Sequence, residues 1–199
     1  MRRRVRIVSG LPVVLAIAAA LAVTAPLAWA ARPPAAAVSR LALRSPDLAA
    51  GETIAVSQVY DRSGCDGGNI SPALAWRDPP AGTRSFAVLM FDTDAPGGDW
   101  WHWAVFDIPA GVSALRAGAG DPARHLLPAG AIQVRNEWGT PGYGGPCPPP
   151  GPPHHYHLAV YALRLAGLEL GASASAAQVA ARVRGNALAE AEIVAIYGR

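Results

Sequence analysis

The sequence predicts a single, mainly β domain that occupies residues 41–199. Short apolar runs, rich in β-branched and aromatic residues, are separated by turns rich in glycine and proline, as is typical of strands. The length supports one domain, because 199 residues without a visible repeat suit a single substantial core once an N-terminal segment is set aside.

The first thirty residues are organised like a secretory signal peptide. Four arginines lie within the first six residues, residues 11–27 are almost entirely apolar, and Ala28-Trp29-Ala30 matches an A-x-A cleavage site. We therefore predict a signal peptide at 1–30, cleavage after Ala30, and export to a periplasm or out of the cell. An uncleaved anchor is the alternative, because residues 7–30 nearly reach the length of a membrane span.

Composition after cleavage excludes nonspecific electrostatic partners. The predicted signal contains four of the 17 basic residues and none of the 14 acidic ones, so removing it changes the net charge from +3 to −1. Such a chain has no basic excess with which to bind nucleic acid or an anionic membrane. Residues 31–40 are predicted to be a flexible leader.

Four apolar runs have the length and composition of strands: residues 54–59, 85–91, 103–108 and 157–165. The run at 85–91 is apolar on both faces, which predicts a central strand that is covered on both sides. Near the C-terminus, residues 175–184 and 186–193 are rich in alanine with apolar spacing near four residues, which predicts one or two helices. A short final strand is expected to end at Tyr197.

Cys65 and Cys147 are the only cysteines. In an exported chain two cysteines are more often bridged than free, so we predict a disulfide between them. Two small buried thiols are the alternative. A metal site built on two isolated cysteines is not expected, because the sequence contains no CxxC pair.

Polar side chains stand where predicted strands end and begin. Asp92 ends one strand and His102 starts the next, so an antiparallel hairpin would place both at one end of the sheet. His154 reaches the same end if the strand near Tyr156 is also antiparallel. Two imidazoles beside an aspartate, which raises their proton affinity, can donate hydrogen bonds to an anion.

The glycine- and proline-rich loop at 142–151 is expected to complete this site. Its corner at 144–146 would offer backbone N–H groups with no side chain in the way, a concavity that suits a phosphate oxygen. Asp94, Pro96 and Trp100 are candidate supporting residues, although Asp94 is explained equally well as a turn residue and the tryptophan as packing. We predict no catalytic residue, no metal and no cofactor, since no nucleophile motif or HExxH-like spacing is present.

A series of motifs runs in order from about Leu41 to the end of the chain. They are SPALAW at 71–76, PAGTRS at 80–85, DTDAP at 92–96, HW at 102–103, Asn136 with Gly139, GYGGPCPPPG at 142–151, HHY at 154–156, AEAE at 189–192 and YGR at 197–199. Together they resemble the bacterial phosphatidylethanolamine-binding proteins (PEBP), and more narrowly the YbhB/YbcL branch, described as Raf-kinase-inhibitor-like.

The resemblance implies two antiparallel sheets in a Greek-key arrangement, peripheral C-terminal helices, and a small anion pocket at one end. The family's pattern implies six ligand-binding positions here: Asp92, His102, Gly145, Pro146, His154 and Tyr156. Gly145 and Pro146 would supply a backbone contact. Two departures are visible, because His155 stands where the family has arginine and Asn186 where bacterial members commonly show histidine. The first puts in question any role of that arginine, such as bridging to a carboxylate.

Three functions follow from these residues and from the resemblance. The first is an exported, non-enzymatic protein that binds a phosphate or phosphoryl head group of a phospholipid or another anionic small molecule. The second is an interaction module or inhibitor that acts on an unknown protein partner through its surface. The third and least favoured is a hydrolase in which Asp92 and His102 activate water. Neither a nucleic-acid partner nor a membrane span after cleavage is expected.

Overall fold

The computed structural model describes residues 40–199, so the predicted signal peptide and nearly all of the predicted leader lie outside the described residues. The strands are β1 (Ala42–Arg44), β2 (Leu74–Arg77), β3 (Ser85–Asp92), β4 (Trp100–Pro109), β5 (Ala114–Leu115), β6 (Ile132–Gln133), β7 (His154–Leu163) and β8 (Ala187–Tyr197). The helices are α1 (Ala176–Asn186) and two 3-10 turns, η1 (Val56–Gln58) and η2 (Pro122–Arg124). Within residues 40–199, no helix combines the length and the apolar character that crossing a membrane requires.

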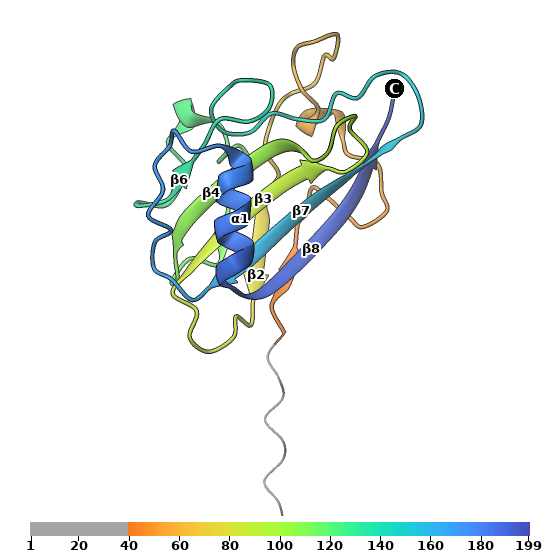
Figure 1. The fold of residues 1–199 in the computed structure, drawn as a ribbon. Coiled ribbons are helices and arrows are strands. Elements are labelled where there is room, and N and C mark those ends of the chain that lie inside the picture. The colour runs from red at the N-terminus through yellow and green to blue at the C-terminus, as the bar shows by residue number, and fades with distance from the viewer. Residues whose placement is uncertain (1–39) are drawn as a thin grey trace, which may run out of the picture. The chain divides into compact units, whose positions relative to one another are not determined.

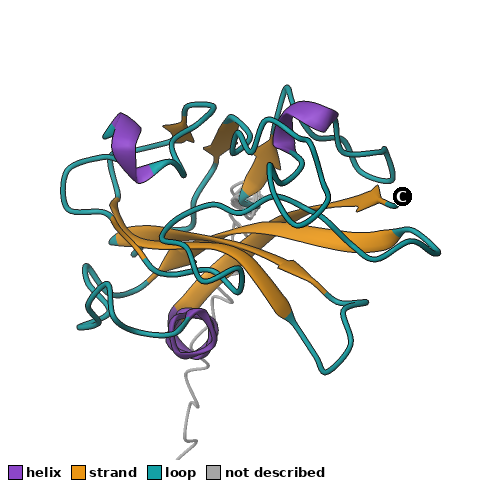
Figure 2. Ribbon diagram, turned by 90° about the horizontal axis from the view of Figure 1, so that it is seen from above, coloured by secondary structure: helices purple, strands orange, loops and turns teal. Residues whose placement is uncertain are grey.

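The strands form two antiparallel sheets, which confirms the predicted fold class. The large sheet has the strand order β6-β4-β3-β7-β8, and the small sheet has the order β1-β2-β5. In Figure 1, α1 lies across one face of the large sheet. Seen from above in Figure 2, the large sheet lies between α1 on one side and short strands and loops on the other.

The central strand β3 is buried along its whole length because both of its faces are covered. Phe86 and Val88 join a core shared with the small sheet, whereas Ala87 and Leu89 join a core beneath α1. Successive side chains of a strand point to opposite faces, so one apolar run can serve two cores. The prediction of a strand covered on both sides is confirmed.

The helix α1 begins with a capping box. The hydroxyl of Ser175 accepts a hydrogen bond from the backbone N–H of Gln178 (3.1 Å), and the Gln178 side chain accepts one from the N–H of Ser175 (3.0 Å). Val179 and Val183 form its buried face. The helix predicted at 175–184 is therefore confirmed.

The second predicted helix, at 186–193, is wrong, because these residues belong to β8. This strand pairs with β7 along almost its whole length, from Ala187 opposite Leu163 to Tyr197 opposite His154. Its inward alanines alternate with outward glutamates at a period of two. The hydrogen bonds and packing along the β7–β8 pair stabilise the strand by more than the intrinsic preference of alanine stabilises a helix. One peripheral helix, and not two, is present near the C-terminus.

The first predicted strand, at 54–59, is also wrong. Ile54 donates its N–H to the Ile196 carbonyl oxygen (2.8 Å), but the chain then turns into η1. The Val59 N–H bonds locally to the carbonyl oxygen of Val56 (3.1 Å), so the segment cannot extend a sheet. The other three runs form β3, β4 and β7. Both β4 and β7 begin three residues earlier than predicted, so His102 and His154 belong to strands and not to the preceding loops.

Candidate ligand-binding site

A pocket of about 140 Å³ lies where β3 ends and β7 begins. It is lined by Asp92, Ala95, Pro96, Trp100, His102, Trp138, Cys147, Pro148, Pro149, His154 and Tyr156. The sheet itself gathers them, since Asp92 stands opposite Trp100 on one neighbouring strand and opposite Tyr156 on the other. The volume lies below the roughly 300–1,000 Å³ of drug-sized ligand sites, so the pocket suits a small chemical group.

Asp92, which is buried, and His154, which is partly buried, form a hydrogen-bonded pair within this pocket. The Nδ1–H of His154 donates to Oδ2 of Asp92 across 2.7 Å, and the backbone N–H of Asp94 donates to Oδ1 across 2.8 Å. Both carboxylate oxygens therefore have a donor, and the His154 ring is held in one orientation. Nε2 of His154 is left as the ring nitrogen that a ligand can reach.

A β-bulge places His102 in the pocket. Met90 pairs with Trp103 and Phe91 pairs with Trp101, so the ladder between β3 and β4 skips His102. Trp101 consequently joins the core beneath α1, while Trp103 joins the opposite core, although strict alternation would put both on one face. Bulges commonly re-aim a side chain beside a functional site, and this one turns His102 inward.

The buried imidazole of His102 is neutral near pH 7. Its Nδ1 lies 2.6 Å from the carbonyl oxygen of Gly144, and because a carbonyl only accepts, Nδ1 carries the ring proton. Burial lowers the pKa of His102 to about 4, although the bond to Gly144 and the charge of Asp92 act in the opposite direction. The expectation that both histidines donate as imidazolium groups is therefore wrong for His102, because desolvation outweighs the attraction of Asp92.

Three buried polar atoms on pocket residues have no hydrogen-bond partner within the protein. They are Nε1 of Trp100, Nε2 of His102 and the hydroxyl of Tyr156. Elsewhere in residues 40–199 only Gln58 and Trp76 have such an atom. Native proteins satisfy nearly all buried polar groups, so these three atoms are available to a polar ligand or to water in the pocket. The tryptophan can only donate, neutral His102 can only accept here, and the tyrosine can do both.

The loop corner at 144–146 does not present free amides, which corrects the sequence-based expectation. Gly144 donates its N–H to the carbonyl oxygen of His102 (2.9 Å), and Gly145 donates to Oδ1 of Asn69 (2.8 Å). Pro146 has no N–H to offer. Neither Gly145 nor Pro146 lines the pocket. The glycines serve packing instead of ligand approach.

We expect Gly145→Ala to lower the free energy of unfolding by about 1–3 kcal/mol, the usual range for overpacking. Its new methyl group would stand 2.1 Å from the Gln58 carbonyl oxygen and 2.6 Å from the Tyr60 nitrogen, and backbone atoms cannot swing aside. Gly111→Ala is the matched control, because nothing lies within 4 Å of its added carbon. Urea unfolding of both variants tests this, and equal stabilities would contradict the packing role.

Trp138 is a pocket residue that the sequence did not reveal. Its ring stacks on Tyr60 with centroids 4.5 Å apart and meets Trp100 edge-on at 5.2 Å. Its Nε1–H donates to the Gly145 carbonyl oxygen (3.1 Å), which fixes the ring against the loop. The available signal was its position between Asn136 and Gly139, both members of the motif series. Ala95, Cys147, Pro148 and Pro149 also line the pocket without having been predicted to.

Asp94 supports the pocket from outside it. Its Oδ2 accepts both the backbone N–H and the Nδ1–H of His155, each across 2.7 Å. These bonds lower the pKa of Asp94. His155 thus bridges to a neighbouring carboxylate, the role that the departure from arginine had put in question. The contribution of Asp94 to the site is its backbone bond to Asp92.

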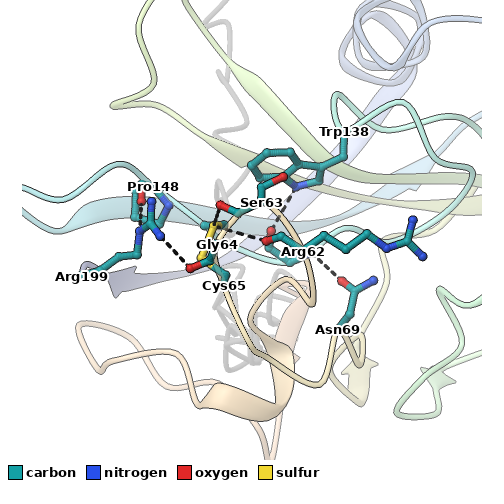
Figure 3. The surroundings of a disulfide bond; sticks show 10 residues. Arg62, Ser63, Gly64, Cys65, Asn69, Trp138, Pro148 and Arg199 are labelled. Atoms are coloured by element: carbon teal, nitrogen blue, oxygen red, sulfur yellow. Dashed lines mark hydrogen bonds between the residues drawn. A yellow bond between two sulfur atoms is a disulfide. The ribbon is translucent and has the colours of Figure 1, made fainter.

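A disulfide joins Cys65 to Cys147, with the two Cα atoms 6.0 Å apart. Figure 3 shows this bond next to Arg199, whose guanidinium donates to the carbonyl oxygens of Pro148 (2.6 Å) and Gly64 (2.9 Å). The pocket wall at 147–149 is therefore tied to the loop at 62–65 by a covalent bond and by one arginine. Among the residues that the structure describes, no group of three or more His, Cys, Asp or Glu side chains could hold a metal ion.

Comparison with known proteins gives concordant matches. A family model described as phosphatidylethanolamine-binding protein matches residues 44–198. The chain is 44% identical over 155 residues to UPF0098 protein YbcL of Escherichia coli (77% of this chain, 85% of that one) and 42% identical over 156 residues to UPF0098 protein YbhB of the same organism (78% and 98%). The solved structure of Escherichia coli YbcL matches with a TM-score of 0.79 at 42% identity, covering 80% of this chain and 99% of that one. LppC of Mycobacterium tuberculosis, whose name assigns it to the lipoproteins, is 36% identical over 165 residues (82% and 75%).

Proposed function

The chain belongs to the phosphatidylethanolamine-binding protein family, and from this membership we propose that it is an exported, non-enzymatic binding protein whose pocket holds a phosphoryl group. The group would come from an anionic small molecule or from a phospholipid head group. The observation that carries the proposal is the set of three orphaned polar atoms on Trp100, His102 and Tyr156. The tryptophan N–H and the tyrosine O–H supply donors for phosphoryl oxygens.

The charge and size of the pocket are compatible with this ligand. Both oxygens of Asp92 already accept hydrogen bonds, which reduces their repulsion of an incoming anion. Because Nδ1 of His154 faces Asp92, a protonated His154 would direct Nε2–H and a positive charge toward the ligand. A volume of about 140 Å³ accommodates a head group, whereas the rest of a longer molecule would lie outside.

Export is supported by three independent features. Residues 1–30 have the order of a signal peptide. The Cys65–Cys147 disulfide is typical of an oxidising compartment outside the cytoplasm. The similar protein LppC carries a lipoprotein name. We propose a periplasmic or extracellular location after cleavage near Ala30.

Tyr156→Phe should weaken binding of inorganic phosphate and phosphoethanolamine about 10- to 100-fold, the range for losing a hydrogen bond to a charged group. The same change should leave the free energy of unfolding unchanged or raise it, because the hydroxyl has no partner in the empty protein. Calorimetric titration and urea unfolding of the mature protein measure the two effects. A purely structural tyrosine would lose stability and keep its affinity.

Tyr161→Phe is the matched control. Its hydroxyl donates to Glu190 (2.9 Å) and Tyr161 does not line the pocket, so this variant should lose about 1 kcal/mol of stability and bind phosphate like the parent. The titrations include a chelator and monitor turnover. Product formation would favour a hydrolase, and no saturable binding to the parent would overturn the proposed function.

A further inference from the structure

One atom of the pocket restricts the chemistry of its ligand. Nδ1–H of His102 is committed to the Gly144 carbonyl oxygen, and the Gly144 N–H returns a bond to the His102 carbonyl oxygen. This reciprocal pair fixes both the ring and its tautomer. Nε2 of His102 therefore presents a lone pair toward its surroundings, and it can only accept a hydrogen bond.

No group of the described protein donates to this lone pair. The ring of Tyr156 lies edge-on to His102 with centroids 5.2 Å apart, and its hydroxyl lies near Asp92 without a hydrogen bond of ordinary geometry to any protein group. Trp138 approaches from another side, with centroids 6.3 Å apart, and its N–H is used by Gly145. The charged or titratable neighbours are Asp92, which favours a proton on His102, and His154, which disfavours one. Burial acts in the same direction as His154 and outweighs Asp92 and the backbone of Gly144 and Gly145, which favour the proton, so the ring stays neutral above about pH 4.

A ligand group that has no hydrogen to donate would therefore be poorly matched to Nε2 of His102. An ionised oxygen placed against Nε2 would set two electron pairs against each other and leave a buried acceptor unsatisfied. A P–OH group would donate to Nε2 while its other oxygens accept from Trp100 and Tyr156. The three orphaned atoms then all find partners on one tetrahedral group.

We infer that the pocket selects phosphoryl groups that carry a P–OH hydrogen, namely phosphomonoesters in their monoanionic form, over phosphodiesters and sulfate. The inference rests on the proposed function and specifies its ligand class. At neutral pH a diester and sulfate have only unprotonated oxygens, whereas a monoester keeps its second proton until about pH 6. The head group of an intact diester phospholipid is thus disfavoured relative to the same head group released as a monoester.

The experiment compares three probes with the mature parent protein at pH 5.5. Phosphoethanolamine is the monoester, glycerophosphoethanolamine the matched diester, and sulfate the tetrahedral anion without a proton. We expect phosphoethanolamine to bind about 10- to 100-fold more tightly than either, because one hydrogen bond to a charged group is at stake. Its affinity should fall at pH 7.5, where the dianion predominates.

His102→Gln provides a second arm. The glutamine amide has N–H donors as well as an acceptor, so the variant should bind diester and sulfate more tightly than the parent does and discriminate less. Equal binding of monoester and diester by the parent would overturn this inference and leave the proposed function standing. Failure of all three probes to bind would overturn both. Comparison of monoester and diester binding by the parent protein tests the inferred selectivity even if His102→Gln does not fold.

Discussion

Loss of the Cys65–Cys147 disulfide should lower the free energy of unfolding by about 4–5 kcal/mol. The bond joins residues 82 apart in sequence, and closing so long a loop in the unfolded chain removes much of its conformational entropy in the chain-entropy model. Urea unfolding of the oxidised mature protein and of the Cys65→Ala/Cys147→Ala double variant measures the difference. The double variant leaves no unpaired thiol to form other disulfides.

Two further measurements separate the disulfide from the packing of its sulfur atoms. Chemical reduction of the parent keeps both side chains in place and should give most of the same loss. Denatured protein from an oxidising compartment should show no free thiol on labelling. Labelling of two thiols would show that the disulfide is not formed. A loss of unfolding free energy below about 1 kcal/mol would contradict its role as a constraint on the unfolded chain.

Acidification from pH 7 to pH 4 should cost about 3 kcal/mol of stability through His102 alone. In the folded protein burial lowers its pKa to about 4, whereas in the unfolded chain it titrates near 6.5. Between these values the unfolded state binds the proton and the folded state does not. Stability contributed by the neutral ring is therefore complete above about pH 6.5 and is lost as pH falls toward 4.

Urea unfolding of the parent and of His102→Gln between pH 4 and pH 7 isolates this effect. The variant lacks the titrating ring, so the stability difference between the two proteins should shrink by about 3 kcal/mol as the pH falls. His125→Gln is the matched control, because His125 is exposed and lies outside the pocket. Parallel pH profiles for His102→Gln and the parent would show that His102 has the same pKa in the folded and unfolded protein, and would contradict its burial as a neutral ring.

The sequence predicts which residues meet at the pocket better than it predicts their chemical state. The sequence predicts that Asp92, His102 and His154 lie close together, because short connections and antiparallel pairing follow from local patterns. The neutrality of His102 could not be predicted, since its burial depends on Trp138 and Tyr156, which come from distant parts of the chain. Such long-range packing has no local sequence signal.

The lack of a local signal for long-range contacts also explains three wrong predictions: the strand at 54–59, the helix at 186–193 and the free amides at 144–146. The alanines of β8 favour a helix until β7 is available as a pairing partner, and that partner is defined only in the fold. The amide of Gly145 looked free because Asn69, which binds it, lies 76 residues earlier. Local propensity and spacing describe a segment alone, and these errors arise where a remote segment decides its hydrogen bonds.

The position of Cys147 makes the disulfide a reporter of pocket motion. Cys65 and Cys147 are only 4% and 8% exposed, so we expect a reductant larger than the pocket to reach the sulfur atoms when the wall of the pocket opens. The rate of reduction in the native protein then measures the frequency of that opening. A bound ligand that rests against the wall would slow the reaction, so reduction half-times measured across a set of compounds could rank their binding without a label.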